Sequence, residues 1–256
     1  MLVRREIKAR YKDSVLGFVW SLLRPLAMLL VYWIVLGQFL GAARGTPEFA
    51  IFIFAGLTLW GLFSEIVAGS TGSIVGNAGL IKKVYLPREV FPLSVVGSAL
   101  FNFAMQLAIL VTFTLIRWQF PLAPIRWAYF FLAIALTLTW AMALGLFLAA
   151  ANVFLRDVQY LVEICLIIFM WASPIVYPFA MVRDGAPAWV EPIYLSNPMT
   201  MAIIGFQRAF WIAGDAMPQP ANIGLRIVIM ITLSVVLLWV AQRTFARLQA
   251  NFAQEL

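Results

Sequence analysis

Long apolar runs restrict the fold of this chain more than any other feature of its sequence. Six of them approach or exceed the roughly 20 residues that a helix needs to cross a bilayer: residues 22–40, 49–69, 93–116, 127–151, 160–177 and 223–242. At 64% hydrophobic and 11% charged residues, the chain carries more apolar surface than one soluble core can bury. The sequence therefore predicts an all-α fold, a polytopic membrane protein with six transmembrane helices in one domain over residues 1–256.

The basic residues predict which side of the membrane each connection faces. The net charge of +7 would suggest nucleic acid in a soluble protein, but in a membrane protein lysine and arginine first report topology. An even number of spans puts both termini on one side, and that side holds twelve of the 18 basic residues, including all four lysines. We expect both termini to lie in the cytoplasm, with no role in binding nucleic acid.

The segment before the first apolar run has a two-sided pattern. Val3, Ile7 and Tyr11 recur every fourth residue, while basic side chains occupy the opposite face. This pattern predicts an amphipathic helix over residues 3–19 that lies in the membrane interface with its cations toward anionic head groups. The residues assigned to it are Arg4, Arg5, Lys8, Tyr11 and Lys12. The alternative is a basic anchor that only fixes topology.

The connection between the last two runs, residues 178–222, is long and not uniformly polar. Its stretch SNPMTMAIIGFQRAFW begins with Asn197 as a helix cap and Pro198 at the favoured first helical position. The helix is shorter than a span, so we interpret it as re-entrant or interfacial, paired with a short turn over residues 179–182. The alternative is an ordinary helix in a surface loop.

Several kinds of chemistry are excluded by what the sequence lacks. With no histidine and a single cysteine, Cys165, the chain cannot form a Ser-His pair, a Cys-His pair or a histidine metal site. Glu65 and Glu163 are expected near the cytoplasmic interface, where pairing or snorkelling explains them more simply than a proton relay. None of the four lysines follows a glycine, so there is no phosphate-binding loop. We expect no catalysis, metal or cofactor on this chain; if ATP drives it, the ATPase is another subunit.

A charged loop, AGLIKKVYLPREVFP at residues 78–92, interrupts the apolar sequence. Residues 77–85 predict a short helix, capped by Asn77 and limited by Pro87. The apolar side of this helix consists of Leu80, Ile81, Val84 and Tyr85. The other side carries Lys82 and Lys83. Such a helix suits docking into a partner protein. The equally weighted alternative is a positive loop that only fixes topology.

Three runs in this sequence carry a family resemblance: REIKARYKDSVLGFVWSLLRPL at 5–26, GLIKKVYLPREVFPL at 79–93 and NVFLRDVQYLVEICLIIFMWASPIVYP at 152–178. They resemble permease subunits of ABC-2 type exporters that move O-antigen, capsular, teichoic-acid or galactan-like polysaccharides. The resemblance covers nearly the whole chain. It implies a homodimer in the bacterial cytoplasmic membrane, bound to two ATP-binding subunits that hold ATP and Mg, with a lipid-linked glycan crossing between the two permeases.

The resemblance also assigns roles to segments. Residues 79–88 would be the coupling helix, residues 3–19 the interface helix and residues 178–211 the external gate helices. The coupling residues would be Leu80, Ile81, Lys82, Lys83, Val84, Tyr85 and Arg88, and the gate residues Asn197, Pro198 and Phe206.

Aromatic residues are the candidates for a glycan path, because sugar C–H faces stack on rings and a neutral path lets a polymer slide. The candidates are Tyr32, Trp33, Trp60, Trp140, Trp171 and Tyr177. The alternatives to polysaccharide export are an ABC-2 permease for a drug or lipid, an ion-coupled carrier that uses Glu65 and Glu163, and a scaffold in a glycan-assembly complex.

Overall fold

The computed structural model of the chain describes residues 17–83 and 86–255, and every regular element in these ranges is helical. The predicted interfacial helix, with Arg4, Arg5, Lys8, Tyr11 and Lys12, lies outside the described residues apart from its last positions. The same is true of Val84 and Tyr85. The elements are α2 (Gly17–Tyr32), η1 (Trp33–Phe39), η2 (Ala42–Arg44), α3 (Phe49–Gly76), α4 (Ala78–Ile81), α5 (Val90–Ile116), α6 (Pro124–Phe154), α7 (Val158–Trp171), α8 (Phe179–Gly185), α9 (Val190–Leu195), α10 (Pro198–Phe210), η3 (Ile212–Gly214), α11 (Ile223–Leu248), η4 (Gln249–Asn251) and α12 (Phe252–Glu255).

Four of the six predicted spans are long apolar helices in the structure. α3, α5, α6 and α11 are each long and apolar enough to cross a membrane. α3 continues past the predicted end at Gly69 to Gly76, through a serine- and threonine-rich stretch. There the Thr71 hydroxyl donates to the Val67 carbonyl at 2.8 Å and the Ser73 hydroxyl to the Ser70 carbonyl at 2.7 Å, so these two side chains are satisfied within the helix. Hydropathy alone finds the apolar part of such a helix and misses its polar end.

The other two predicted spans have a different form. The run 22–40 is helical but changes type, from the α-helix α2 to a π-helix over Trp33–Phe39. The run 160–177 is cut short: α7 has 14 residues, about 21 Å at 1.5 Å per residue, against a hydrocarbon core of about 30 Å. The chain turns at Ser173 and Pro174, where proline cannot continue the helix. The count of six spans is therefore not confirmed by the described residues.

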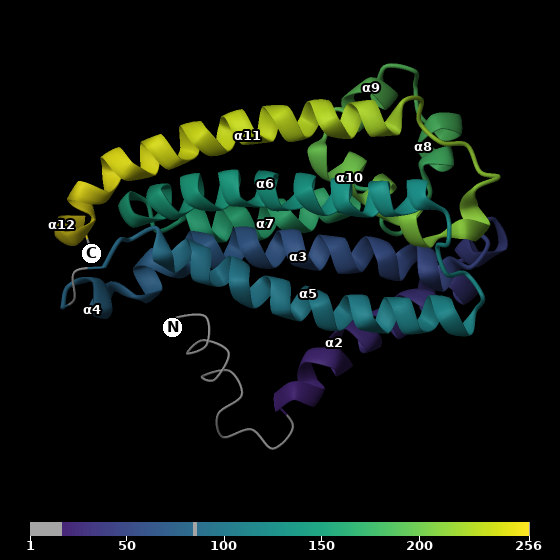
Figure 1. Cartoon of the computed structure of the whole chain (residues 1–256), viewed down its shortest axis with the longest axis horizontal. Coiled ribbons are helices and arrows are strands. Elements are labelled where there is room, and N and C mark those ends of the chain that lie inside the picture. Colours follow the sequence, from purple (N-terminus) through teal and green to yellow (C-terminus); the bar gives the residue numbers. More distant parts are fainter. Residues whose placement is uncertain (1–16, 84–85, 256) are drawn as a thin grey trace.

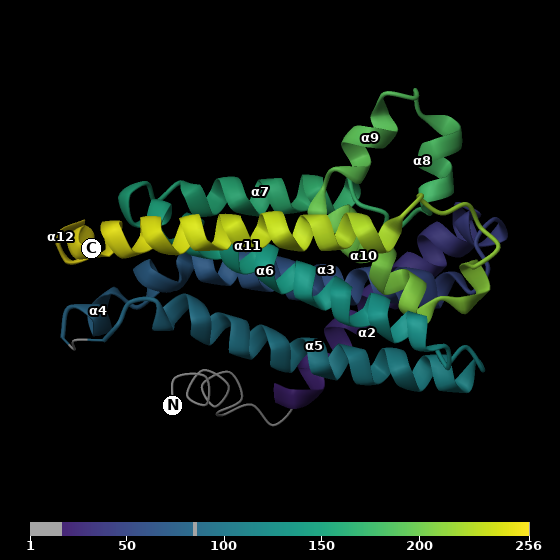
Figure 2. The ribbon, with the colours of Figure 1, turned by 45° about the horizontal axis from the view of Figure 1, so that its top comes forward.

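The long helices run side by side along one axis, as Figures 1 and 2 show. α6 lies at the centre and packs against α3, α10 and α11. Close packing of α3 on α6 needs small residues: a Cβ added to Gly145 would lie 2.9 Å from the Ser70 Cβ. α8 and α9 project beyond the bundle near the start of α11 (Figure 2).

Two groups of buried side chains hold the bundle together. The larger one joins α3, α6 and α10 over most of their length. The smaller one lies where α12 and the α3–α5 connection meet (Figure 1), and we call that end of the bundle the tail end. The opposite end, with the start of α3, the end of α5 and helices α8 and α9, is the cap end.

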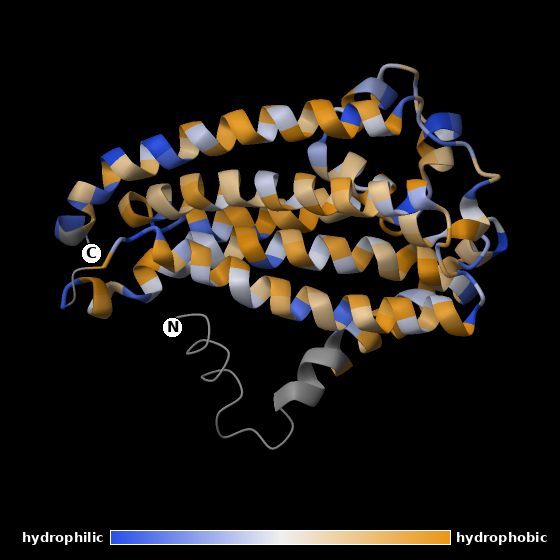
Figure 3. Ribbon diagram, in the orientation of Figure 1, coloured by the Kyte–Doolittle hydropathy of each residue, from blue (hydrophilic) through white to orange (hydrophobic). Residues whose placement is uncertain are grey.

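The outer faces of the bundle are apolar, as Figure 3 shows by hydropathy. α7 and α11 expose many large apolar side chains, such as Ile167 at 62% and Leu233 at 58%. Hydrophilic residues gather instead toward the two ends of the long helices (Figure 3). Apolar surface on this scale is stable in contact with lipid or with another apolar protein surface, not with water.

Candidate functional site

The charged loop after α3 lies at the tail end and begins with the short helix α4. The predicted helix over 77–85 is wrong in length, because α4 covers only Ala78–Ile81 among the described residues of this loop. The predicted cap is also wrong. The Asn77 side-chain amide donates to the Ser73 carbonyl at 2.8 Å instead of capping α4. Asn77 directly follows α3, so its amide satisfies one of the free carbonyls that every helix leaves in its last turn.

The apolar side of the loop faces the protein itself. Leu80 and Ile81 are half-buried and pack against the smaller cluster of buried residues. Lys82 and Lys83, in contrast, are exposed. Leu80 and Ile81 are therefore partly engaged by the protein itself, and their predicted contact with a partner stays a prediction. Among the described side chains of the loop, the two lysines offer an exposed charged surface to a partner.

The C-terminal tail closes the tail end around Phe252, which is fully buried. Its ring meets Phe245 edge-on with centroids 5.4 Å apart and Phe154 at 6.1 Å. The Arg88 guanidinium, from the charged loop, lies 5.7 Å from the centroid of the same ring. Phe252 thus joins α11, α6 and the loop in one contact.

The sequence contains a signal for this tail that the apolar runs do not reveal. Residues of the smaller cluster recur at alternating spacings of three and four along α11 and beyond it. These residues are Leu238, Ala241, Phe245, Leu248 and Phe252. The pattern continues past the predicted span end at residue 242, so one face of the last helix stays attached to the protein after the apolar run stops.

A polar contact lies in the middle of the bundle. Glu65 accepts two hydrogen bonds from the Asn102 amide nitrogen, at 2.8 and 3.0 Å. Glu65 is near the centre of α3 (49–76) and Asn102 near the centre of α5 (90–116). Glu65 is thus central in α3, which continues past its apolar run, and its predicted place near the cytoplasmic interface stays a prediction. Glu163 is exposed on α7, with the Gln159 side-chain nitrogen at 3.5 Å.

The aromatic candidates for a glycan path are spread over the bundle. Trp60 is buried and packs on Phe63 with ring centroids 5.2 Å apart. Trp33 and Trp171 are exposed, at 42% and 49%. The three others, Tyr32, Trp140 and Tyr177, are half-buried against the core. The hydroxyl of Tyr177 donates to the Trp171 carbonyl at 2.8 Å and so fixes the turn after α7.

The segment predicted as external forms α8, α9 and α10. The cap is confirmed: the Met199 backbone nitrogen donates to the Asn197 side-chain oxygen at 3.0 Å, and Pro198 occupies the first turn. The short turn predicted over 179–182 is the first part of α8. α10 is almost entirely buried between α3 and α6, and Phe206 is fully buried, 5.8 Å from the Phe130 ring centroid. α10 is therefore part of the core, not an ordinary surface helix.

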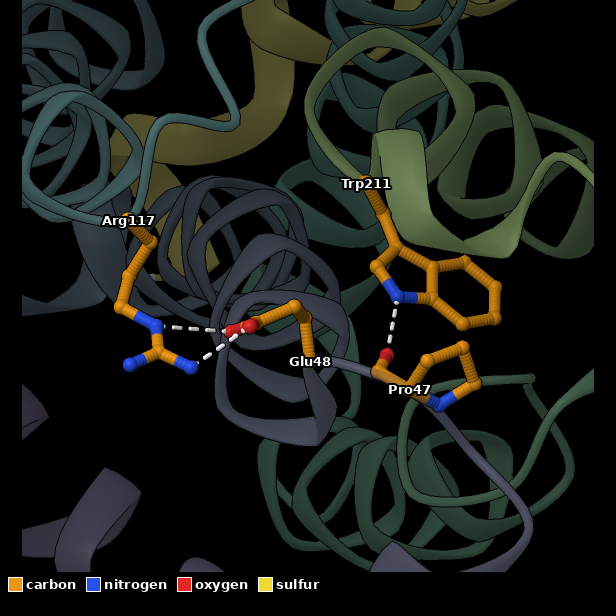
Figure 4. Close-up of polar contacts among 4 residues, drawn as sticks. All are labelled: Pro47, Glu48, Arg117 and Trp211. Carbon is orange, nitrogen blue, oxygen red and sulfur yellow. Dashed lines mark hydrogen bonds and ion pairs between the residues drawn. The ribbon is translucent and has the colours of Figure 1, made fainter.

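Polar contacts lock α10 in place. Gln207 donates to the Pro174 carbonyl at 2.7 Å, which satisfies the backbone at the end of α7. The Trp211 indole nitrogen donates to the Pro47 carbonyl at 2.6 Å, just before α3 (Figure 4). Arg126, at the start of α6, donates to the Arg208 carbonyl at 2.7 Å and pairs with Asp215. α10 is thus tied to three other segments.

A bidentate ion pair joins the adjacent ends of α3 and α5 at the cap end. Arg117 donates from Nε and Nη2 to the two Glu48 carboxylate oxygens at 3.0 and 2.6 Å (Figure 4). Hydrogen bonding to Glu48 and the charge of its carboxylate raise the pKa of Arg117, so the pairing further favours the charged form that a guanidinium already has at physiological pH.

These features define an integral membrane protein made of helices, with two differentiated ends and, in the described part of the chain, no cluster of potential metal ligands. The family model described as "ABC-2 type transporter" matches residues 1–211. The chain belongs to this family, and it is a multi-pass membrane component of a transporter.

Several curated proteins are similar over much of the chain. An O-antigen export system permease protein RfbA from Myxococcus xanthus is 33% identical over 100% of this chain and 94% of its own length. A protein of the same name from Klebsiella pneumoniae is 25% identical over 82% of this chain and 78% of its own length. A polysialic acid transport protein KpsM from Escherichia coli is 27% identical over 79% of this chain and 76% of its own length.

Proposed function

We propose that this chain is the permease subunit of an ATP-driven exporter that moves a lipid-linked polysaccharide of the O-antigen or capsular type across the bacterial cytoplasmic membrane. The observation that carries the proposal is the similarity over the whole chain to an O-antigen export permease, together with similarity to a polysialic acid transport protein. Both substrates are long glycans. The rival substrates, drugs and lipids, have no comparable support.

The energy would come from a separate ATP-binding subunit. The sequence has no phosphate-binding loop, so ATP and Mg would be held by the partner. We propose two ATP-binding subunits on a homodimer of this chain, in line with the family resemblance. The exposed apolar faces of α7 and α11 are available for contact between the two copies or with lipid.

The tail end is the proposed site of coupling and faces the cytoplasm in this proposal. Lys82 and Lys83 would contact the ATP-binding subunit, while Leu80 and Ile81 transmit the displacement to the buried cluster. Arg88 and Phe252 extend that connection to α11 and α6. A push on the loop would thus move the ends of several helices together, because they share one cluster.

The segment from residue 178 to 211 is proposed to form the outer side of the path. Asn197, Pro198 and Phe206 position α10, and Gln207 ties α10 to the end of α7. The six aromatic candidates remain proposed contacts of the glycan. Of these, Trp33 and Trp171 are the first choices for substitution, because they are exposed and their replacement leaves no cavity in the core.

The experiment is reconstitution of the full-length chain with its co-expressed ATP-binding subunit in vesicles that contain lipid-linked O-antigen-type glycan. We expect glycan translocation that requires ATP and is lost when the ATP-binding subunit carries a substituted phosphate-loop lysine. Translocation that persists without ATP and stops when the proton gradient is dissipated would support an ion-coupled carrier, for which Glu65 at the middle of α3 is the candidate group. No translocation in either condition would support a scaffold.

The coupling surface has its own test. Lys82→Glu with Lys83→Glu reverses two exposed charges without opening the core. We expect glycan-stimulated ATP turnover and export to fall together while the amount of inserted permease is unchanged. The matched control is Arg44→Glu, an exposed arginine of η2 just before α3, outside residues 178–211, which is expected to leave coupling intact. Normal export by the double variant would show that the two lysines do not form the proposed contact with the ATP-binding subunit.

A further inference from the structure

A groove at the cap end has a lining that, apart from Trp33, no part of the proposed transport cycle uses. It lies between α2, the start of α3 and the end of α5, and its volume is about 590 Å³. Leu29, Trp33 and Phe113 line its apolar part, and Glu48 and Arg117 line its polar part. One groove therefore combines hydrocarbon-like walls with an ion pair.

The local structure explains why α2 does not fill this space. At Gly37 the π-helix approaches α3 closely, since a Cβ there would lie 3.0 Å from the Phe49 ring. From that contact α2 slants away from α3 and α5, as Figure 1 shows. The π-helix, a rare form that is frequently found at functional sites, thus lies where the groove begins.

The polar part of the groove lies at the depth where lipid head groups are expected. Glu48 immediately precedes α3 and Arg117 immediately follows α5, so both mark the ends of membrane-length helices. The next residue, Trp118, is 93% exposed, and exposed tryptophan is typical of the membrane–water interface. The apolar lining extends from there toward the middle of the helices.

Arg117 keeps hydrogen-bonding capacity after pairing with Glu48. Nε and one terminal nitrogen reach the carboxylate, while the other terminal nitrogen points away from it (Figure 4). The side chain is 52% exposed. A guanidinium binds phosphate oxygens with its remaining N–H groups, and the adjacent carboxylate attracts an ammonium group. The ion pair is thus complementary to a zwitterionic head group and less so to one with a net negative charge.

The volume fits a single acyl chain and not a protein helix. A group the size of a water molecule occupies about 30 Å³, so the groove holds on the order of 20 groups of this size. One acyl chain with its glycerol end has about this number of heavy-atom groups. A helix about 10 Å wide would use the same volume in roughly one and a half turns. A segment of a second copy of the chain would therefore not be enclosed by the groove.

We propose that this groove binds a zwitterionic glycerophospholipid of the phosphatidylethanolamine type, with one acyl chain against Leu29, Trp33 and Phe113 and the phosphate on Arg117. Transfer of the acyl chain from the bilayer to the groove gains little free energy, because the lipid tails of the bilayer are as apolar as the walls of the groove. Retention of the lipid depends on the head-group contact. The head-group contact at Glu48 and Arg117 has no part in the proposed glycan path or in coupling to the ATP-binding subunit, and of the lining residues only Trp33 is also a candidate glycan contact.

The test is native mass spectrometry of the full-length chain, extracted in mild detergent with its co-purifying subunits. The probes are phosphatidylethanolamine, phosphatidylglycerol and polyprenyl phosphate, each added at the same concentration. We expect the wild type to retain one phosphatidylethanolamine per chain in preference to the two anionic lipids. Arg117→Ala should reduce that retention on the order of 10-fold, as expected for loss of a hydrogen bond to a charged group.

A second variant keeps the test valid if loss of the ion pair impairs folding. Ala43→Trp fills the groove, which Ala43 lines, while leaving Glu48 and Arg117 in place. It should abolish retention. Arg183→Ala, which removes another exposed ion-paired arginine, is the control and should leave retention unchanged. Equal retention by the wild type and Ala43→Trp would overturn the proposal, as would preferential retention of polyprenyl phosphate, or cysteine cross-linking at Leu29 between two copies.

Discussion

Replacement of Phe252 by alanine tests whether the tail holds the charged loop in place. Phe252 is fully buried and contacts Phe154, Phe245 and Arg88. Truncation of a buried phenylalanine costs about 3–5 kcal/mol. Because α12 has only four residues, most of its stability comes from this side chain, and we expect local release of the tail instead of global unfolding.

The expected size of the effect follows from that cost. A loss of about 3 kcal/mol raises a local opening constant on the order of 100-fold, at 1.4 kcal/mol for each factor of ten. Amide hydrogen exchange measures such openings. In Phe252→Ala, exchange in residues 77–91 and 245–255 should speed up by about that factor, while exchange in the middle of α3 and α6 stays unchanged.

A functional consequence should accompany this release. If the loop transmits force through the buried cluster, export per ATP hydrolysed should fall in Phe252→Ala even though the lysine surface is intact. Deletion of residues 254–256 is the matched control, since Gln254 and Glu255 are exposed and the deletion retains Phe252. Unchanged exchange in the loop would refute the structural argument. Faster exchange with normal export would refute the role of the cluster in coupling.

Three further substitutions test the packing of the bundle by thermal unfolding in detergent. Gly145→Ala should destabilise the protein by about 1–3 kcal/mol, because the new Cβ meets the Ser70 Cβ at 2.9 Å. Adding Ser70→Gly should restore part of the loss. An unchanged midpoint of thermal unfolding would mean that α3 and α6 separate freely. Asn197→Ala should cost about 1 kcal/mol through loss of the helix cap, and Asn197→Ser should cost less. Trp211→Phe keeps an aromatic ring but loses the hydrogen bond to the Pro47 carbonyl, at a cost of about 1 kcal/mol; no cost would show that the bond is not needed to hold α10.

The sequence predicted much of the fold because lipid-facing and core-facing residues are both apolar in a membrane protein. Long runs such as 127–151 therefore stand out and correspond to helices such as α6. The cap at Asn197 was also predictable, since capping depends only on residues adjacent in sequence. Local chemistry of this kind needs no knowledge of what packs against the helix.

The candidate coupling site was only partly predictable. The two lysines mark the loop in sequence, but the buried cluster against which Leu80 and Ile81 pack includes residues more than 150 positions away, such as Phe245 and Phe252. The contact between Glu65 and Asn102 was missed for a similar reason, because it depends on which faces of α3 and α5 become neighbours.

The sequence by itself determined that this chain is a helical membrane protein and that it contains no phosphate-binding loop of the Gly-Lys type. Apolar runs and missing residue types are properties of single segments, so composition and periodicity are enough to read them. Tertiary structure alone decided that α10 is part of the core, that Phe252 closes the tail end, and that Arg117 and Glu48 meet beside an apolar groove. Each of these depends on which helix faces become neighbours, and apolar residues specify burial without specifying a partner.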